Sequence, residues 1–230
     1  MSIAIGVNAY GTNNPVAFGH TAGEIEGLEA MVDFIKFDGP LVEKIFTVPD
    51  GISRIRVRLY GGGGGGAQGD SSGTEYWGAG GGGAAYVESL IDVTEGDTVY
   101  FNLGAGGASI SGCRQNGGQG KNGQDSTFTY GEVNLVAGGG KGGNTIYSGG
   151  DGGVASGGDI NSDGEKGQGT LRGGYDGWPG GDSGSGGRAL EGGQFGERDL
   201  GPGAGGAGSG HNNCLSGAGG DGKIIMHFMI

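Results

Sequence analysis

The sequence has few prolines and cysteines, and it has no long apolar run. It contains 5 prolines and 2 cysteines among 230 residues. The scarcity of proline excludes collagen, as does the absence of a strict three-residue glycine register. No stretch reaches the ~18 apolar residues that a membrane-spanning helix needs, so we expect no membrane insertion. Two cysteines do not indicate a disulfide framework.

Basic residues are also scarce, because 13 lysines and arginines stand against 25 acidic residues, for a net charge of -12. This balance argues against binding to nucleic acid or to an anionic membrane surface. The first residues, MSIAIGVNAYGTNNP, lack the basic and apolar regions of a secretory signal. We therefore expect Cys113 and Cys214 to be free thiols of a protein assembled in a cytoplasm. A pairing across the fold is the alternative.

What the chain has in excess is glycine, which supplies 65 residues. Residues 1–60 hold 7 glycines, whereas residues 138–222 hold 35. A helical bundle is excluded, because each glycine inside a helix costs about 1 kcal/mol relative to alanine. A flexible linker is the alternative to weigh, since glycine is the residue that loses most backbone entropy on ordering.

One helix is predicted over residues 21–38. Thr21 and Glu24 have the spacing of a capping box, and apolar residues follow at helical intervals at Ile25, Leu28, Val32 and Ile35. Asp38-Gly39-Pro40 would end the helix. Packing within its own domain and docking on a partner are equally compatible with this pattern. We assign residues 1–43 to attachment or oligomerisation by position.

About seven short strands follow. They are predicted at 44–48, 52–60, 84–93, 97–103, 126–130, 132–137 and 223–230. Residues 44–137 would form a β-domain, either a small antiparallel sandwich or a barrel, completed by the C-terminal strand. Arg54, Arg56 and Arg58 alternate with apolar residues, which favours a solvated sheet face paired with acids over an anion site.

The C-terminal strand makes residues 138–222 an insertion that leaves the β-domain and returns to it. Glycines recur there every third residue, as at Gly174, Gly177 and Gly180. Three residues per turn is the period of polyproline II. The predicted fold class is therefore mainly β, with a glycine-rich insertion of polyproline-II type and a short N-terminal helix.

No catalytic, metal or cofactor site is predicted. At this glycine content, matches to dinucleotide-binding glycine motifs arise by chance. Asp159, Asn161 and Asp163 resemble the first half of a calcium loop, but Thr170 stands where a glutamate is needed. Of the three histidines, His20, His211 and His227, the last lies on a strand and is interpreted as structural. The chain is not expected to be an enzyme.

The aromatic residues between glycine tracts are the candidate contact residues. A lattice of glycine helices has no room for them inside, so they should lie at loop tips, where they suit sugar stacking or protein contact. Coverage of local apolar patches or of a subunit seam is the alternative. The candidates are Tyr76, Trp77, Tyr147, Tyr175, Trp178, Phe195 and His211.

Several stretches resemble a known family. They are Phe46–Gly66, Gly80–Asp97, Leu103–Gly107, Gly157–Asn161 and Gly217–Ile225. In this order, over about 44–230, they resemble the glycine-rich domain of bacteriophage tail fibre and baseplate-associated proteins. The composition is also similar to that of the polyglycine-helix adhesins at tail-fibre tips of T-even-like phages, which lack such a β-domain in front.

The resemblance implies a virion protein of the tail fibre or tail tip, assembled in the host cytoplasm, that attaches to the host surface. The implied partners are a bacterial surface glycan or outer-membrane protein, other tail proteins, and further copies in a homotrimer. The alternative is a purely structural baseplate or head-decoration component. A glycine-rich extracellular matrix protein is a third class, disfavoured by the missing signal.

Overall fold

A computed structural model describes residues 32–69, 78–111, 118–144, 148–169, 178–184, 201–209 and 215–230. Ten strands lie in these ranges. They are β1 (Val32–Asp38), β2 (Leu41–Thr47), β3 (Arg54–Tyr60), β4 (Tyr86–Asp92), β5 (Thr98–Leu103), β6 (Ser126–Tyr130), β7 (Val133–Ala137), β8 (Ala155–Ser156), β9 (Ile160–Ser162) and β10 (Lys223–Met229). All seven predicted strands are confirmed, and β1, β8 and β9 were not predicted.

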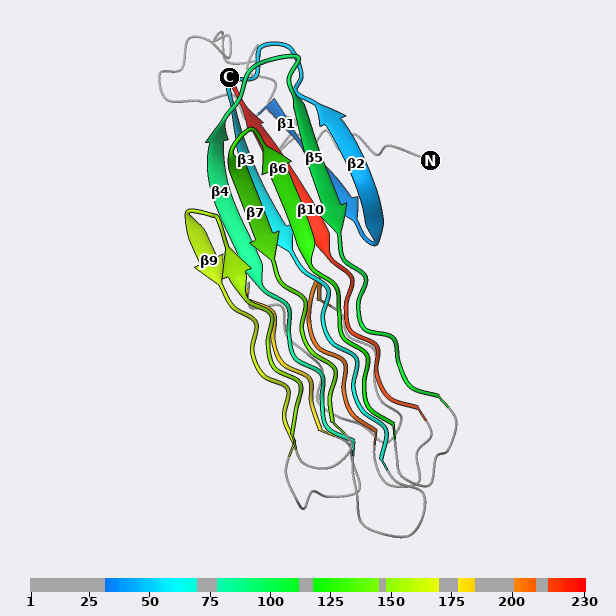
Figure 1. Cartoon of the computed structure of the whole chain (residues 1–230). Coiled ribbons are helices and arrows are strands. Elements are labelled where there is room, and N and C mark those ends of the chain that lie inside the picture. Colours follow the sequence, from blue (N-terminus) through cyan, green and yellow to red (C-terminus); the bar gives the residue numbers. More distant parts are fainter. Residues whose placement is uncertain are drawn as a thin grey trace, which may run out of the picture.

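The strands form two antiparallel sheets (Figure 1). Sheet A has the order β1-β10-β3-β4-β9, and sheet B has the order β2-β5-β6-β7-β8. The chain passes from sheet A to sheet B at Gly39-Pro40, between β1 and β2. The C-terminal strand β10 lies inside sheet A, between β1 and β3.

One apolar core joins the two sheets. Alternate residues of β3, such as Ile55, Val57 and Leu59, are fully buried and share this core with Phe101 and Phe128 of sheet B. The sheets therefore pack face to face as a sandwich, and in the described part of the chain they do not close into a barrel. The sequence had left these two architectures open.

The predicted N-terminal helix is wrong over its described part. Residues 32–38 form β1, which pairs with β10, and the described residues contain no α-helix. Ile35 and Phe37 pack against the core, which is a period of two. The helical spacing depended largely on residues 21–31, which lie outside the described residues. Pairing with β10 overrides the local pattern, as tertiary context does for any weak propensity.

Below the sandwich, the strands continue into glycine-rich segments that run side by side (Figure 1). We call these extended, non-strand stretches the glycine lattice. The described segments of the lattice are 61–69, 78–85, 104–111, 118–125, 138–144, 148–154, 163–169, 178–184, 201–209 and 215–222. Thus described glycine-rich segments from both sides of β6 and β7 build one lattice together.

Hydrogen bonds between the segments repeat every three residues. In 61–69, the amides of Gly61, Gly64 and Ala67 donate to one neighbouring segment, 78–85. The amides of Gly62, Gly65 and Gln68 donate to 118–125, and those of Gly63 and Gly66 donate to 215–222. Each amide thus points about a third of a turn away from the preceding one, and the backbone hydrogen bonds are satisfied without α-helix or β-sheet.

Candidate functional site at the far end of the glycine lattice

Two segments lie at the centre of the lattice. Segment 61–69 donates to three segments (78–85, 118–125 and 215–222) and accepts from three others (104–111, 138–144 and 201–209). Segment 78–85 likewise exchanges hydrogen bonds with 61–69, 138–144, 148–154, 163–169, 178–184 and 201–209. All described residues of both central segments are buried. Surrounded by backbone, these segments consist of glycine and alanine, with Gln68 as the exception near the end of segment 61–69.

Segments at the perimeter lack neighbours on their outer side, and short polar side chains replace part of the missing hydrogen bonds. Asn122 Oδ1 accepts from the Gly142 amide at 2.9 Å, and Asp125 Oδ1 accepts from the Gly139 amide at 2.8 Å. Asp221 Oδ1 accepts from the Gly106 amide at 2.8 Å. Part of the acidic character thus serves the backbone at the surface, where the carboxylates stay solvated.

The end of the lattice opposite the sandwich gathers the ends of several described segments. Gly78 donates to the carbonyl of Ser209, and Trp178 donates to the carbonyl of Gly78. The Asn144 carbonyl accepts from Ala79. Isolated β-bridges join Gln68 to Gly118 and Ser111 to Leu215. The described residues on either side of the undescribed segments 70–77, 112–117, 145–147, 170–177 and 210–214 therefore lie at this far end.

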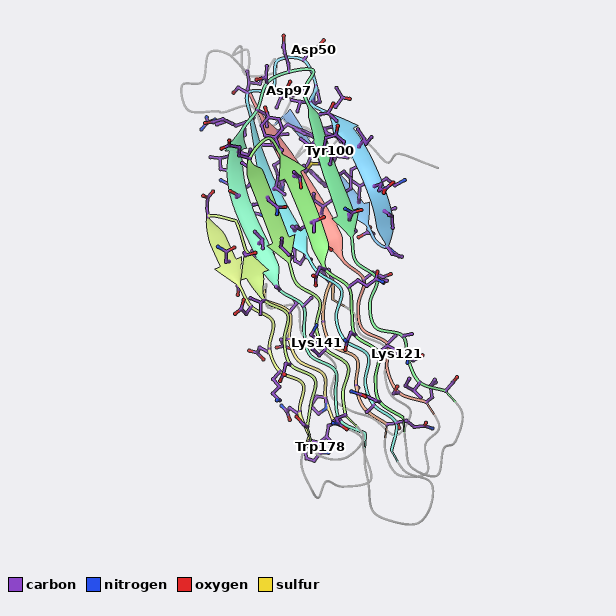
Figure 2. The ribbon with its side chains drawn as sticks, in the orientation of Figure 1. Asp50, Asp97, Tyr100, Lys121, Lys141 and Trp178 are labelled. Carbon is purple, nitrogen blue, oxygen red and sulfur yellow. The ribbon has the colours of Figure 1, made fainter. Side chains whose placement is uncertain are left out.

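Trp178 is the one predicted contact residue that the structure describes, and Figure 2 shows it at this far end. Its carbonyl accepts from the Gly208 amide at 2.8 Å, which fixes its backbone to the lattice. The residue is half-buried, and its indole Nε1 has no hydrogen-bond partner among the described residues. A rigid backbone thus holds an aromatic ring where the lattice ends.

The other candidates, Tyr76, Trp77, Tyr147, Tyr175, Phe195 and His211, lie outside the described residues, so their contact role stays a prediction. All but Phe195 belong to segments whose described flanks lie at the far end. Phe195 belongs to 185–200, whose described neighbours Gly184 and Gly201 lie beside the sandwich: Gly184 adjoins Ser162 of β9, and Gly201 lines a recess with Asp38 of β1. The described flanks of the segment that holds Phe195 therefore lie apart from the far end.

In this structure the carboxylates of the half calcium loop accept hydrogen bonds from other residues of the protein. Asp159 Oδ2 accepts from the Ser89 hydroxyl at 2.8 Å and from the Leu90 amide at 2.9 Å, and these bonds hold its pKa below the usual value. Asp163 Oδ1 accepts from the Ala155 amide. Within the described ranges, no group of three or more His, Cys, Asp or Glu side chains is placed to hold a metal ion.

In the part of the chain that the structure describes, no helix has the length and apolar character needed to cross a membrane.

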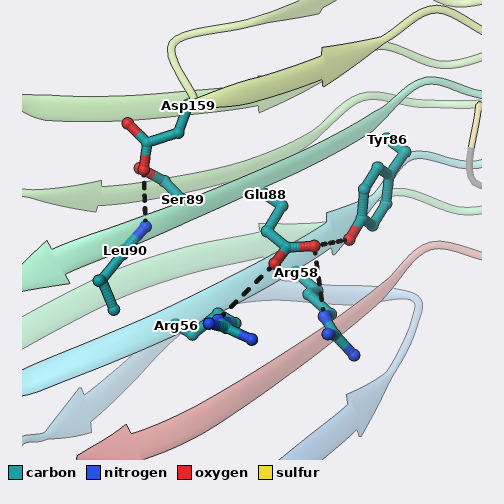
Figure 3. A network of polar contacts seen from close by, with 7 residues as sticks. All are labelled: Arg56, Arg58, Tyr86, Glu88, Ser89, Leu90 and Asp159. Atoms are coloured by element: carbon teal, nitrogen blue, oxygen red, sulfur yellow. Dashed lines mark hydrogen bonds and ion pairs between the residues drawn. The ribbon is translucent and has the colours of Figure 1, made fainter.

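A polar network on sheet A had no counterpart among the predicted sites (Figure 3). Glu88 of β4 lies 3.7 Å from Arg56 Nε and 3.4 Å from Arg58 Nε, and it accepts a hydrogen bond from the Tyr86 hydroxyl. Burial and then this hydrogen bond raise the pKa of Tyr86. The alternation of arginines in β3 was the available signal. This alternation predicts a solvated face paired with acids, but it does not reveal that Arg56 and Arg58 form ion pairs with the same carboxylate, that of Glu88.

Comparison with known protein families identifies a family for this chain. No curated protein sequence matches the chain. The family model described as a glycine-rich domain matches residues 41–229, from the start of β2 to the end of β10. This match covers the sandwich strands and the lattice together and leaves out β1. The chain belongs to this glycine-rich domain family.

Proposed function

We propose that the protein is a bacteriophage virion component of the tail fibre or tail tip that attaches to the host surface through the far end of its glycine lattice. One observation carries the proposal: the described flanks of five segments meet at that end, and these segments hold most of the candidate aromatic residues. The partner would be a surface glycan or an outer-membrane protein. The sequence resemblance to phage tail proteins supports the virion assignment.

Rigidity is what the lattice would contribute to attachment. A loop anchored at both ends on a hydrogen-bonded scaffold loses less entropy on binding than a free loop does. Several copies, such as the expected homotrimer, would add avidity to weak individual contacts. The opposite end, where β1 begins and β10 ends, is available for attachment to other tail proteins (Figure 1).

We further propose that the lattice segments are polyproline-II-type helices. The support is the three-residue repeat of hydrogen-bond partners, which is the repeat of that helix. Vibrational optical activity of the purified protein should then show a polyproline II component beside the β signal. A spectrum of β-sheet and coil alone would contradict this assignment.

Cell binding tests the attachment function. Purified protein should bind cells in a panel of bacterial strains and block infection of the bound strain by the parent phage. Trp178→Ala should weaken binding by about tenfold or more, as is usual for a central aromatic contact. Tyr100→Ala is the matched control, because Tyr100 is 53% exposed but lies on the sandwich. If no strain is bound, or both variants bind equally well, attachment through this end is wrong.

A purely structural role, in a baseplate or as head decoration, is the second candidate. It is favoured by exposed apolar residues on sheet B: Ile45 is 65% exposed and pairs with Tyr100, and Val42 on the same edge strand is 74% exposed. Such a patch is typical of protein contact. In this case the protein would not bind cells, and Tyr100→Ala would weaken its incorporation into virions.

A further inference from the structure

The outer face of sheet A carries an excess of positive charge, although the molecule as a whole is acidic. The cations Lys36, Arg54, Arg56, Arg58 and Lys223 share this face with the carboxylates Asp38, Glu88 and Asp92. On the other side of the sheet Ile55 of β3, Val87 of β4 and Met226 of β10 are buried, so the charged residues face outward. A chain of net charge -12 thus presents more cations than carboxylates on one sheet face.

Two of these arginines are incompletely paired. Arg56 and Arg58 share the single carboxylate of Glu88, which also accepts from Tyr86 (Figure 3). Buried Arg58 Nε has no hydrogen-bond partner despite its 3.4 Å approach to Glu88. The two side chains remain 44% and 36% exposed. The Arg58 Nε is itself out of reach of a ligand, but the exposed parts of the two planar guanidinium groups are placed to receive further oxyanions.

The pKa of His227 is affected by the same excess of positive charge. It lies opposite Arg56 on the neighbouring strand β10. Burial lowers its pKa first, and the charges of Arg58 and Arg56 lower it further, whereas Glu88 acts in the opposite direction. The guanidinium groups thus outweigh their carboxylate at this point of the face.

The shape of the face indicates an extended ligand. Arg54, Arg56 and Arg58 follow one another along β3 at intervals of roughly 6.7 Å, because alternate residues of a strand share a face. Apolar and aromatic side chains border this row: Leu90 pairs with Arg56 on one side, and His227 with its ring neighbour Phe34 lies on the other. Such borders suit the apolar faces of sugar rings.

We propose that the outer face of sheet A binds a linear acidic polysaccharide, with the carboxylates of its sugars on Arg56 and Arg58 and its rings along Leu90, His227 and Phe34. A nucleic acid duplex fits less well, because it carries one charge per about 1.7 Å of axis, denser than one carboxylate per sugar, and is therefore repelled more strongly by the rest of this acidic chain. An acidic protein surface offers carboxylates without the repeat. This inference does not depend on binding at the far end of the lattice.

Affinity for polygalacturonate, a linear polyuronate, tests the proposal with the full-length protein. Binding should be measurable at about 10 mM salt and should weaken at about 200 mM, as screening increases. Neutral dextran should not bind. The double variant Arg56→Gln with Arg58→Gln should lose about tenfold or more in affinity, equivalent to one charged hydrogen bond.

The matched control is Lys121→Gln with Lys141→Gln, which removes the same charge from the exposed surface of the lattice (Figure 2). It should retain wild-type affinity. Equal losses in both double variants would overturn the proposal in favour of non-specific charge attraction. Absence of polygalacturonate binding, with Arg56- and Arg58-dependent binding of polyglutamate, would overturn it in favour of an acidic protein.

Folding of the arginine variant is checked by its thermal transition. A second measurement uses the wild-type protein and therefore does not depend on whether the arginine variant folds. Polygalacturonate should raise the pKa of His227, followed by NMR of the imidazole, because added carboxylates favour the charged ring. An unchanged His227 titration in the presence of saturating polygalacturonate would place the ligand elsewhere and contradict the proposal.

Discussion

The backbones of Gly64 and Lys141 are in close contact in the lattice, so that a Cβ atom on Gly64 would lie 2.0 Å from the carbonyl oxygen of Lys141. The obstacle is backbone, which cannot rotate away as a side chain can. Gly64→Ala should therefore destabilise the protein by about 3 kcal/mol or more, at the upper end of overpacking effects. Chemical denaturation measures this change.

The control for Gly64→Ala is Lys121→Ala, whose side chain is exposed at the lattice perimeter. It should change stability by less than about 0.5 kcal/mol. Similar stability of the two variants would mean that segment 61–69 is not enclosed on all sides.

The perimeter hydrogen bonds predict a second, local effect. Asn122→Ala removes the acceptor for the Gly142 amide and should cost about 1 kcal/mol. Hydrogen exchange at the Gly142 amide should accelerate, while exchange at Gly140, which donates to Gly62, should change little. Asn122→Asp keeps an acceptor oxygen and should restore protection. Equal exchange at Gly142 in the wild type and Asn122→Ala would show that water serves this amide equally well.

The bridge between Ser111 and Leu215 predicts the outcome of mild oxidation. Cys113 and Cys214 lie outside the described residues, but the chain ties them to these two residues by one or two peptide units. At about 3.6 Å per residue, these tethers allow the two sulfurs to meet. A mild oxidant should give an intramolecular Cys113–Cys214 crosslink, detected by mass spectrometry of non-reduced peptides. Crosslinks that form only between molecules would contradict this register.

His227 predicts how stability depends on pH. Burial, together with Arg58 and Arg56, lowers the pKa of His227 in the folded protein, and Glu88 opposes this effect. The unfolded chain therefore takes up a proton near the ordinary value of ~6.5, where the folded chain does not. Stability should fall as the pH drops below that value towards the pKa of the folded state, and level off beneath it.

Denaturation curves of the wild type and of His227→Gln between about pH 7.5 and pH 5.5 test this dependence, since ordinary carboxylates contribute little in that range. The variant should lose much of the slope. The same slope in both proteins would assign the pH dependence to other groups.

The sequence by itself determined the β-domain. Strands such as β3 and β10 alternate apolar and polar residues, so their existence and their buried faces follow from a period of two. It also determined that the long glycine tract returns to a C-terminal strand. The glycine triplets indicated a three-residue repeat, and the hydrogen-bond partners in the lattice follow such a repeat.

Only the tertiary structure decided the identity of residues 32–38 and the arrangement of the glycine segments. β1 is a strand because β10, almost 200 positions later, offers it an open edge. The run 61–66 is central because six segments, distant in sequence, surround it. Hydrogen bonds between glycine backbones involve no side chains, so the sequence contains no pattern that predicts which glycine tracts are neighbours. The charge on the outer face of sheet A likewise appears only when β3, β4 and β10 are placed side by side.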